Sequence, residues 1–200
     1  MSFMFKHIAA MNLAFWSEIG SRLNPLQLRR RGEADLASAA RLHWVDERTA
    51  LGDPMLDRLA CYWRQARQGK ALPPVSAIDP FALRFALGNM VVVEPSGDSI
   101  EFAVRLYGSK LAYRNGYDLT GKMLRDIPDV ETRRATEQAA ARVLFGMQPL
   151  LMQRHRLLEG EIVDYAALLL PFGDSTPSRI IIALSYPDRQ DGAAFDSERL

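Results

Sequence analysis

The sequence predicts an α+β protein with a five-stranded antiparallel sheet, helices on one face of that sheet, and an N-terminal helical extension. Two β-rich segments come first, a stretch of turns and helical patterns follows, and three further β-rich segments end the folded part. Strands from both ends of one domain, with helices between them, form a two-layer sandwich. The 200 residues, of which 48% are hydrophobic, suffice for one well-buried core.

The first 52 residues are expected to form the helical extension. Residues 1–23 are apolar, but Asn12, Ser17 and Glu18 interrupt the run, which argues against a secretory signal or a membrane span. An amphipathic helix and a basic stretch from Arg22 to Arg31 are predicted, followed by a weakly helical segment, 33–50. The extension is expected to pack on its own domain or on a second copy. The alternatives are peripheral membrane or nucleic-acid contact through the basic residues, and a poorly ordered leader.

A compact domain is predicted over residues 53–187. Asp53-Pro54 and Asp79-Pro80 each indicate a helix start, because aspartate caps free backbone N–H groups and proline fits the first helical position. The apolar spacing after each pair supports two helices, which end at Gly69 and Gly88.

Two strands are expected next, at 89–94 and 100–108, and they form a hairpin. In the second strand, alternation predicts one buried face, made up of Ile100, Phe102, Val104 and Leu106.

The segment from Tyr107 to Ile127 is rich in turn residues. Ser109 is expected to cap a short helix that Asn115-Gly116 ends, and residues 118–121 form a further turn. A longer helix is predicted over 130–145. Three strands then close the domain, at 149–158, 161–171 and 178–186, and residues 188–200 form a polar tail.

Composition and motifs exclude several classes of function. The formal net charge of +1 gives no general attraction to nucleic acid. Cys61 is the single cysteine, so an intrachain disulfide is excluded and a reducing, cytoplasmic location is expected. The sequence contains no serine in a nucleophile turn and no glycine-rich phosphate-binding loop. It also contains no histidine or carboxylate cluster with the spacing of metal ligands. We therefore expect no enzymatic activity and no metal site.

The predicted order of elements resembles a PAS domain, and the acidic-x-x-Gly turn at 118–121 is similar to one that many PAS domains carry. The resemblance is closer to a bacterial subfamily of stand-alone PAS-like proteins, over about residues 53–187. The matching residues are Tyr62, Trp63, Arg67, Gly69, Leu72, Pro73, Ile78, Asp79 and Pro80 before the sheet, and Arg105, Gly108, Gly116, Asp118, Leu119, Thr120 and Gly121 after the first hairpin. The resemblance implies a PAS fold and a sensory or regulatory role.

PAS domains bind haem, flavin or small metabolites, or bind nothing and dimerise. The helix 130–145 carries no histidine for haem ligation, and Cys61 lies far from the position used by light-sensing flavin relatives. We therefore expect no cofactor. His155 lies within a predicted strand and is expected to be a hydrogen-bonded structural residue more often than a metal ligand.

The concave face of the sheet is expected to hold a cavity. Its candidate ligand-binding residues are Arg105, Tyr107, Tyr113, Tyr117, His155 and Tyr165. Tyrosines supply apolar walls with a polar tip, and arginine favours an anionic group. The alternative is that Arg105 pairs with Asp118 or another acid and that the tyrosines only pack.

Two functions remain open. The first is a cytoplasmic PAS-type sensor that binds a small organic or anionic molecule and signals in trans through a protein partner. The second is a ligand-free interaction module that forms a homodimer through its N-terminal helices.

Overall fold

The computed structural model describes residues 40–46, 49–97, 100–158 and 161–186, without the side chains of 155–158 and 161–163. The predicted amphipathic helix, the basic stretch and the polar tail lie outside the described residues. Homodimerisation through the N-terminal helices and peripheral membrane contact through residues 1–31 therefore stay predictions.

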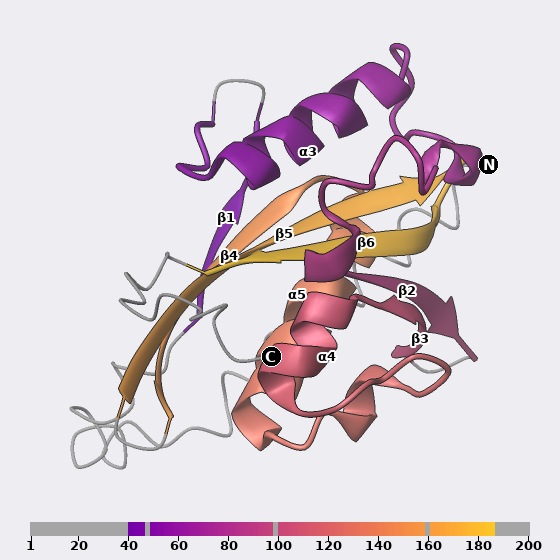
Figure 1. The fold of residues 1–200 in the computed structure, drawn as a ribbon. Coiled ribbons are helices and arrows are strands. Elements are labelled where there is room, and N and C mark those ends of the chain that lie inside the picture. Colours follow the sequence, from indigo (N-terminus) through magenta and orange to yellow (C-terminus); the bar gives the residue numbers. More distant parts are fainter. Residues whose placement is uncertain (1–39, 47–48, 98–99, 159–160, 187–200) are drawn as a thin grey trace, which may run out of the picture. The chain divides into compact units, whose positions relative to one another are not determined.

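The described residues form one six-stranded antiparallel sheet in the order β1-β4-β5-β6-β2-β3 (Figure 1). The strands are β1 (Arg41–Trp44), β2 (Met90–Ser96), β3 (Glu101–Tyr107), β4 (Leu150–Leu158), β5 (Glu161–Gly173) and β6 (Pro177–Ser185). The antiparallel sheet of the predicted α+β class is confirmed, and β2 to β6 fall within about two residues of the predicted strands.

Helices cover both faces of this sheet. The α-helices are α3 (Pro54–Ala66), α4 (Ser109–Asn115) and α5 (Val130–Gly146), and the 3-10 turns are η1 (Val75–Ala77), η2 (Leu87–Asn89) and η3 (Leu124–Asp126). Helices α4 and α5 lie on one face, as expected, and α3 lies on the other (Figure 1).

Strand β1 replaces part of the weak helix predicted over 33–50, and this prediction is wrong at residues 41–44. His43 pairs with Leu151 and Trp44 with Leu150 at the edge of β4. Four residues are too few for a recognisable alternation, and the partner strand lies more than a hundred residues away in the sequence. Local propensity therefore gave no signal for the sixth strand.

The second Asp-Pro pair does not begin a regular helix, which corrects the helix predicted after Pro80. Asp79 Oδ1 accepts a hydrogen bond from the N–H of Phe81 at 2.9 Å, two residues ahead, which is an Asx-turn geometry. Turns follow up to η2. Asp53, in contrast, accepts from the N–H of Leu56 at 2.8 Å and caps α3 as predicted.

A register shift in the β2–β3 ladder changes which face the end of β3 presents. Val92 pairs with Leu106, but Val93 pairs with Val104, so Arg105 is an extra residue in β3. Val104 therefore packs with α5, whereas Leu106 packs on the α3 face. The predicted single apolar face is correct for Phe102 and Val104. It is wrong for Leu106 and for Ile100, which precedes β3 and is about half exposed.

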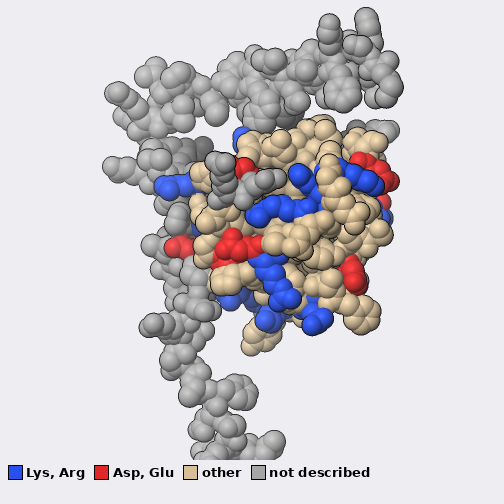
Figure 2. All heavy atoms as spheres, turned by 90° about the horizontal axis from the view of Figure 1, so that it is seen from above, with Lys and Arg blue, Asp and Glu red and all other residues tan. Residues whose placement is uncertain are grey.

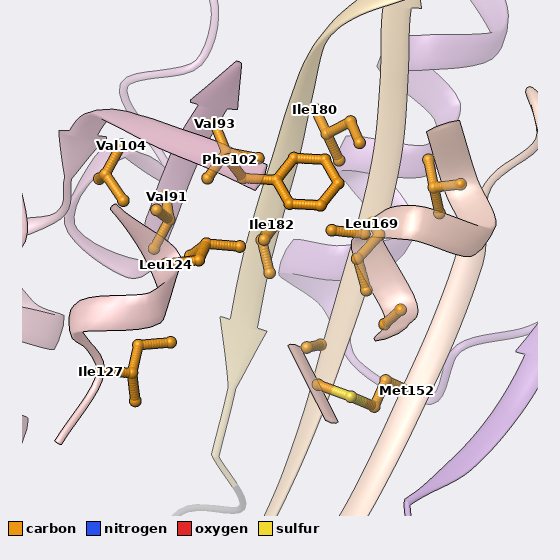
Figure 3. Close-up of a cluster of buried hydrophobic side chains, with 14 of the residues drawn as sticks. Val91, Val93, Phe102, Val104, Leu124, Ile127, Met152, Leu169, Ile180 and Ile182 are labelled. Atoms are coloured by element: carbon orange, nitrogen blue, oxygen red, sulfur yellow. The ribbon is translucent and has the colours of Figure 1, made fainter. Parts of the chain in front are cut away.

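The core divides into one apolar cluster on each face of the sheet. The cluster on the α5 face is drawn in Figure 3, where side chains of β2, β3, β5 and β6 meet Leu124 of η3. Ile127 and Met152 lie at the end of this cluster away from Phe102 (Figure 3). Both residues also line a cavity.

Candidate functional site

A cavity of about 340 Å³ lies between the sheet and the segment from α4 to α5. Its walls come from the five strands β2 to β6, both helices and the turns between them. The lining residues are Val91, Tyr107, Leu111, Arg114, Asn115, Tyr117, Leu124, Ile127, Thr132, Thr136, Met152, Tyr165, Ala167, Ile182, Leu184 and Tyr186. The volume is within the range of small-molecule sites, which are mostly apolar with a few polar groups.

The turn at residues 118–121 positions two of the tyrosines that line the cavity. The N–H of Gly121 donates to the carbonyl of Val104 at 2.9 Å, which ties the predicted turn to the sheet. Asp118 Oδ1 accepts from the N–H of Thr120 at 2.7 Å, and this bond lowers the pKa of the Asp118 carboxyl. Thr120 Oγ1 in turn accepts from the N–H of Tyr107 at 3.1 Å. The turn therefore places Tyr107 and Tyr117 together.

Four tyrosines form two tilted pairs around the cavity. The ring centroids of Tyr107 and Tyr117 lie 5.9 Å apart, and those of Tyr165 and Tyr186 lie 5.6 Å apart. Asn115 Nδ2 donates to the Tyr107 hydroxyl at 2.7 Å. Burial, together with the neighbouring Tyr117, raises the pKa of Tyr107 above its usual range. The hydroxyl of Tyr107 is therefore neutral at any physiological pH.

Two arginines bring positive charge to the same region. The guanidinium of Arg114 lies 4.0 Å from the ring centroid of Tyr186, a cation–π arrangement. Arg154 of β4 is buried, with 2% of its surface exposed. Its Nη1 donates to Thr132 Oγ1 and to the Tyr165 hydroxyl, at 3.3 Å each.

The structure brings together three of the six predicted site residues, Tyr107, Tyr117 and Tyr165. Tyr113 points away from the cavity and is 93% exposed. Arg105 is also outside the cavity and pairs with Glu94, so it does have an acidic partner, as the alternative interpretation held. Its hydrogen bond lowers the pKa of the Glu94 carboxyl. His155 lies in β4, but its side chain is outside the described residues.

Sequence reasoning missed most of the polar lining, namely Arg114, Asn115, Thr132, Thr136 and Tyr186, and it missed Arg154 beside that lining. Strand alternation offered one usable signal. Met152 and Arg154 share a face of β4, so a buried Met152 places Arg154 on the cavity side. The helical residues carry no comparable pattern.

The Tyr-Trp…Arg motif of α3 holds the opposite face together. Trp63 Nε1 donates to the carbonyl of Pro171 at 2.6 Å, and the Tyr62 hydroxyl donates to that of Ala77 at 2.6 Å. Burial and the nearby Asp79 raise the pKa of Tyr62. The guanidinium of Arg67 lies 5.1 Å from the ring centroid of Trp63. A second hollow, of about 440 Å³, lies beside this motif.

The described surface carries charges of both signs. On the face seen in Figure 2, Lys and Arg side chains are interspersed with Asp, Glu and uncharged residues. Among the described residues, no three His, Cys, Asp or Glu side chains are grouped so as to hold a metal ion. None of the helices in that part of the chain is long and apolar enough to cross a membrane.

Comparison with known families agrees with the fold. The sequence model of a family described as PAS domain matches residues 52–184. No curated protein matches the chain.

Proposed function

We propose that this chain, which belongs to the PAS domain family, binds a small organic molecule in the tyrosine-lined cavity and signals in trans through a protein partner. PAS domains are sensory or regulatory modules and are typically non-catalytic. The observation that carries the proposal is a cavity of ligand size whose lining is half apolar side chains and half tyrosine, threonine, asparagine and arginine side chains, so that it offers both an apolar wall and polar groups to a ligand.

A thermal-shift screen of metabolite classes tests this proposal. A ligand present at a hundredfold excess over its dissociation constant stabilises the folded state by about 2.7 kcal/mol, which such a screen resolves. The matched control is Ala167→Leu, because Ala167 is fully buried in β5 and lines the cavity. We expect at least one class to raise the melting temperature of the wild type and to have no effect on this variant. Equal stabilisation of both proteins, or of neither, would contradict the proposal.

A ligand-free interaction module is the second candidate, and one observation favours it. Trp44 and Phe145 are each about half exposed. Trp44 packs against Gly146, where a Cβ atom would lie 2.5 Å from the indole ring, so both aromatic residues belong to the same end of the described fold. Exposed aromatic residues of this kind are enriched in protein interfaces.

The test of this candidate must leave β1 in place, because removal of residues 1–50 would also remove a strand of the sheet. A chain that begins at Ala40 retains β1. If the N-terminal extension mediates homodimerisation, light scattering will give a dimer for the full chain and a monomer for the shortened one. A dimer in both cases would rule out the extension as the dimer contact.

A further inference from the structure

We propose that the ligand of the cavity is a small aromatic acid whose carboxylate accepts a hydrogen bond from Tyr165, with the charge of Arg154 behind it. This inference rests on the proposed function, because it requires the cavity to be a ligand site.

Arg154 is held on the cavity side of the sheet by the β4–β5 ladder. It pairs across the ladder with Tyr165, and the guanidinium lies 6.0 Å from the centroid of the Tyr165 ring. The two hydroxyls that accept from its Nη1, on Thr132 and Tyr165, both belong to the cavity wall. The guanidinium therefore lies directly behind the polar end of the cavity.

The charge of Arg154 is poorly compensated. Among the described residues its ion pair is with Glu131, at 4.0 Å from Nη2, and the Glu131 side chain is 62% exposed. Its buried Nε has no hydrogen-bond partner in the same part of the chain. Burial of a cation without a close counter-ion is costly, so an anion that enters this end of the cavity would be stabilised.

Tyr165 supplies the direct contact. Its hydroxyl oxygen accepts from Arg154, and no described residue accepts its proton. A hydroxyl can donate and accept at once, and a donor that is polarised by a neighbouring cation donates more strongly. A carboxylate oxygen is the acceptor that fits this donor best.

The rest of the cavity fits an aromatic ring. Its volume of about 340 Å³ is at the lower end of the range of small-molecule sites, which suits one ring with a short acid side chain. The walls offer tyrosine faces for stacking, together with apolar side chains from Leu111, Met152 and Ile182.

Isothermal titration of the full chain with phenylacetate and with phenylacetamide tests the inference, because the two probes differ in charge and hardly in shape. We expect the acid to bind about tenfold or more tightly than the amide. Tyr165→Phe keeps the ring and removes the donor, so it should weaken phenylacetate about tenfold and phenylacetamide much less, because a neutral amide oxygen accepts a weaker hydrogen bond than a carboxylate. Its control is Tyr113→Phe, which changes an exposed tyrosine outside the cavity.

Arg154→Gln should weaken phenylacetate by about ten- to a hundredfold, and its control is Arg134→Gln on the exposed side of α5. If Arg154→Gln fails to fold, the affinities of Tyr165→Phe and Tyr113→Phe for phenylacetate still test whether the cavity binds a carboxylate. Equal binding of acid and amide, or equal effects of Tyr165→Phe and Tyr113→Phe, would overturn the inference and leave the cavity as a site for neutral ligands. Absence of binding by either probe also overturns it, and the metabolite screen then decides separately whether the proposed function stands.

Discussion

At the scale of single residues, burial decides the role of each polar side chain more than its type does. Arg105 and Arg154 are both strand arginines. Arg105 lies at a bulge and forms an exposed pair with Glu94, whereas Arg154 is buried and bonds to hydroxyls of the cavity wall. An exposed pair of this kind contributes little to stability. The proposed recognition of a carboxylate therefore depends on the buried arginine and not on the exposed one.

The raised pKa of Tyr107 predicts a loss of stability at high pH. The unfolded chain releases this phenolic proton near pH 10, and the folded protein holds it to a higher pH. Above about pH 10 the unfolded state therefore binds fewer protons, and the free energy of unfolding falls as the pH rises. Urea unfolding from pH 9 to 11.5 should show a shallower decline for Tyr107→Phe than for the wild type. Parallel declines would show that Tyr107 titrates normally.

The cap of α3 gives a second prediction at this scale. Asp53 accepts the N–H of Leu56 through one carboxylate oxygen and the hydroxyl of Ser185 in β6 through the other. Asp53→Ala should lower the free energy of unfolding by about 1–2 kcal/mol, because it removes the cap. Asp53→Asn keeps a capping side chain and should cost less, and Ser185→Ala isolates the contact with β6. If Asp53→Ala and Asp53→Asn are equally stable in denaturant unfolding, the capping role is wrong.

At the scale of elements, backbone packing explains the glycine that precedes α4. Gly108 has an ordinary φ of −61°, which any residue can adopt. Glycine is required there because a side chain would have no room. A Cβ atom there would lie 2.5 Å from the carbonyl oxygen of Leu87 and closer still to that of Gly88. The turn η2 and the start of α4 therefore approach each other as closely as their backbones permit.

Gly108→Ala should destabilise the fold by about 1–3 kcal/mol, because one of the two backbones must move. The matched control is Ser109→Ala, one residue further on and exposed. The cap predicted at Ser109 is wrong, because Gly108 is the N-cap residue of α4 and no side chain caps the helix, so this control removes no capping bond. Chemical denaturation of both variants measures the difference. Equal stability of the two would mean that η2 and α4 are not in backbone contact.

The sequence predicted elements well where local chemistry was sufficient. The Asp53 cap, the left-handed Gly116 after α4, and the β5 and β6 strands follow from residues close together in the chain. The predictions from sequence failed where the structure of a segment depends on a strand that is distant in the sequence. Strand β1 exists because β4 offers an edge, and the bulge at Arg105 exists because β2 fixes the register.

The candidate site was predictable only in part, for the same reason. The tyrosines beside the turn at 118–121 were found, because the turn chemistry is local. Thr132, Arg154 and Tyr186 come from three other elements that only the folded sheet brings together. Tyr113 has the same residue type as Tyr107, and only the geometry of α4 places it outside.

At the scale of the whole molecule, residues before Asp53 contribute to the core. Val45 and Leu51 are buried with α3, and Leu42 of β1 packs on the opposite cluster. Burial of Val45 and Leu51 contributes about 1.5–3 kcal/mol each. A chain that begins at Asp53 should therefore be about 3–6 kcal/mol less stable in urea unfolding than one that begins at Ala40. Equal stability would place the start of the folded domain at Asp53.

The central claim is that the cavity between the sheet and α4 and α5 is a ligand site. Two-dimensional NMR spectra of the full chain, titrated with the metabolite that stabilises it most, test this claim most directly. We predict that the largest shifts in the spectrum of the described residues will fall on Tyr107, Leu111, Tyr165 and Ala167, which line the cavity. Shifts confined to residues outside the cavity, or no shifts with any metabolite class, would contradict the claim.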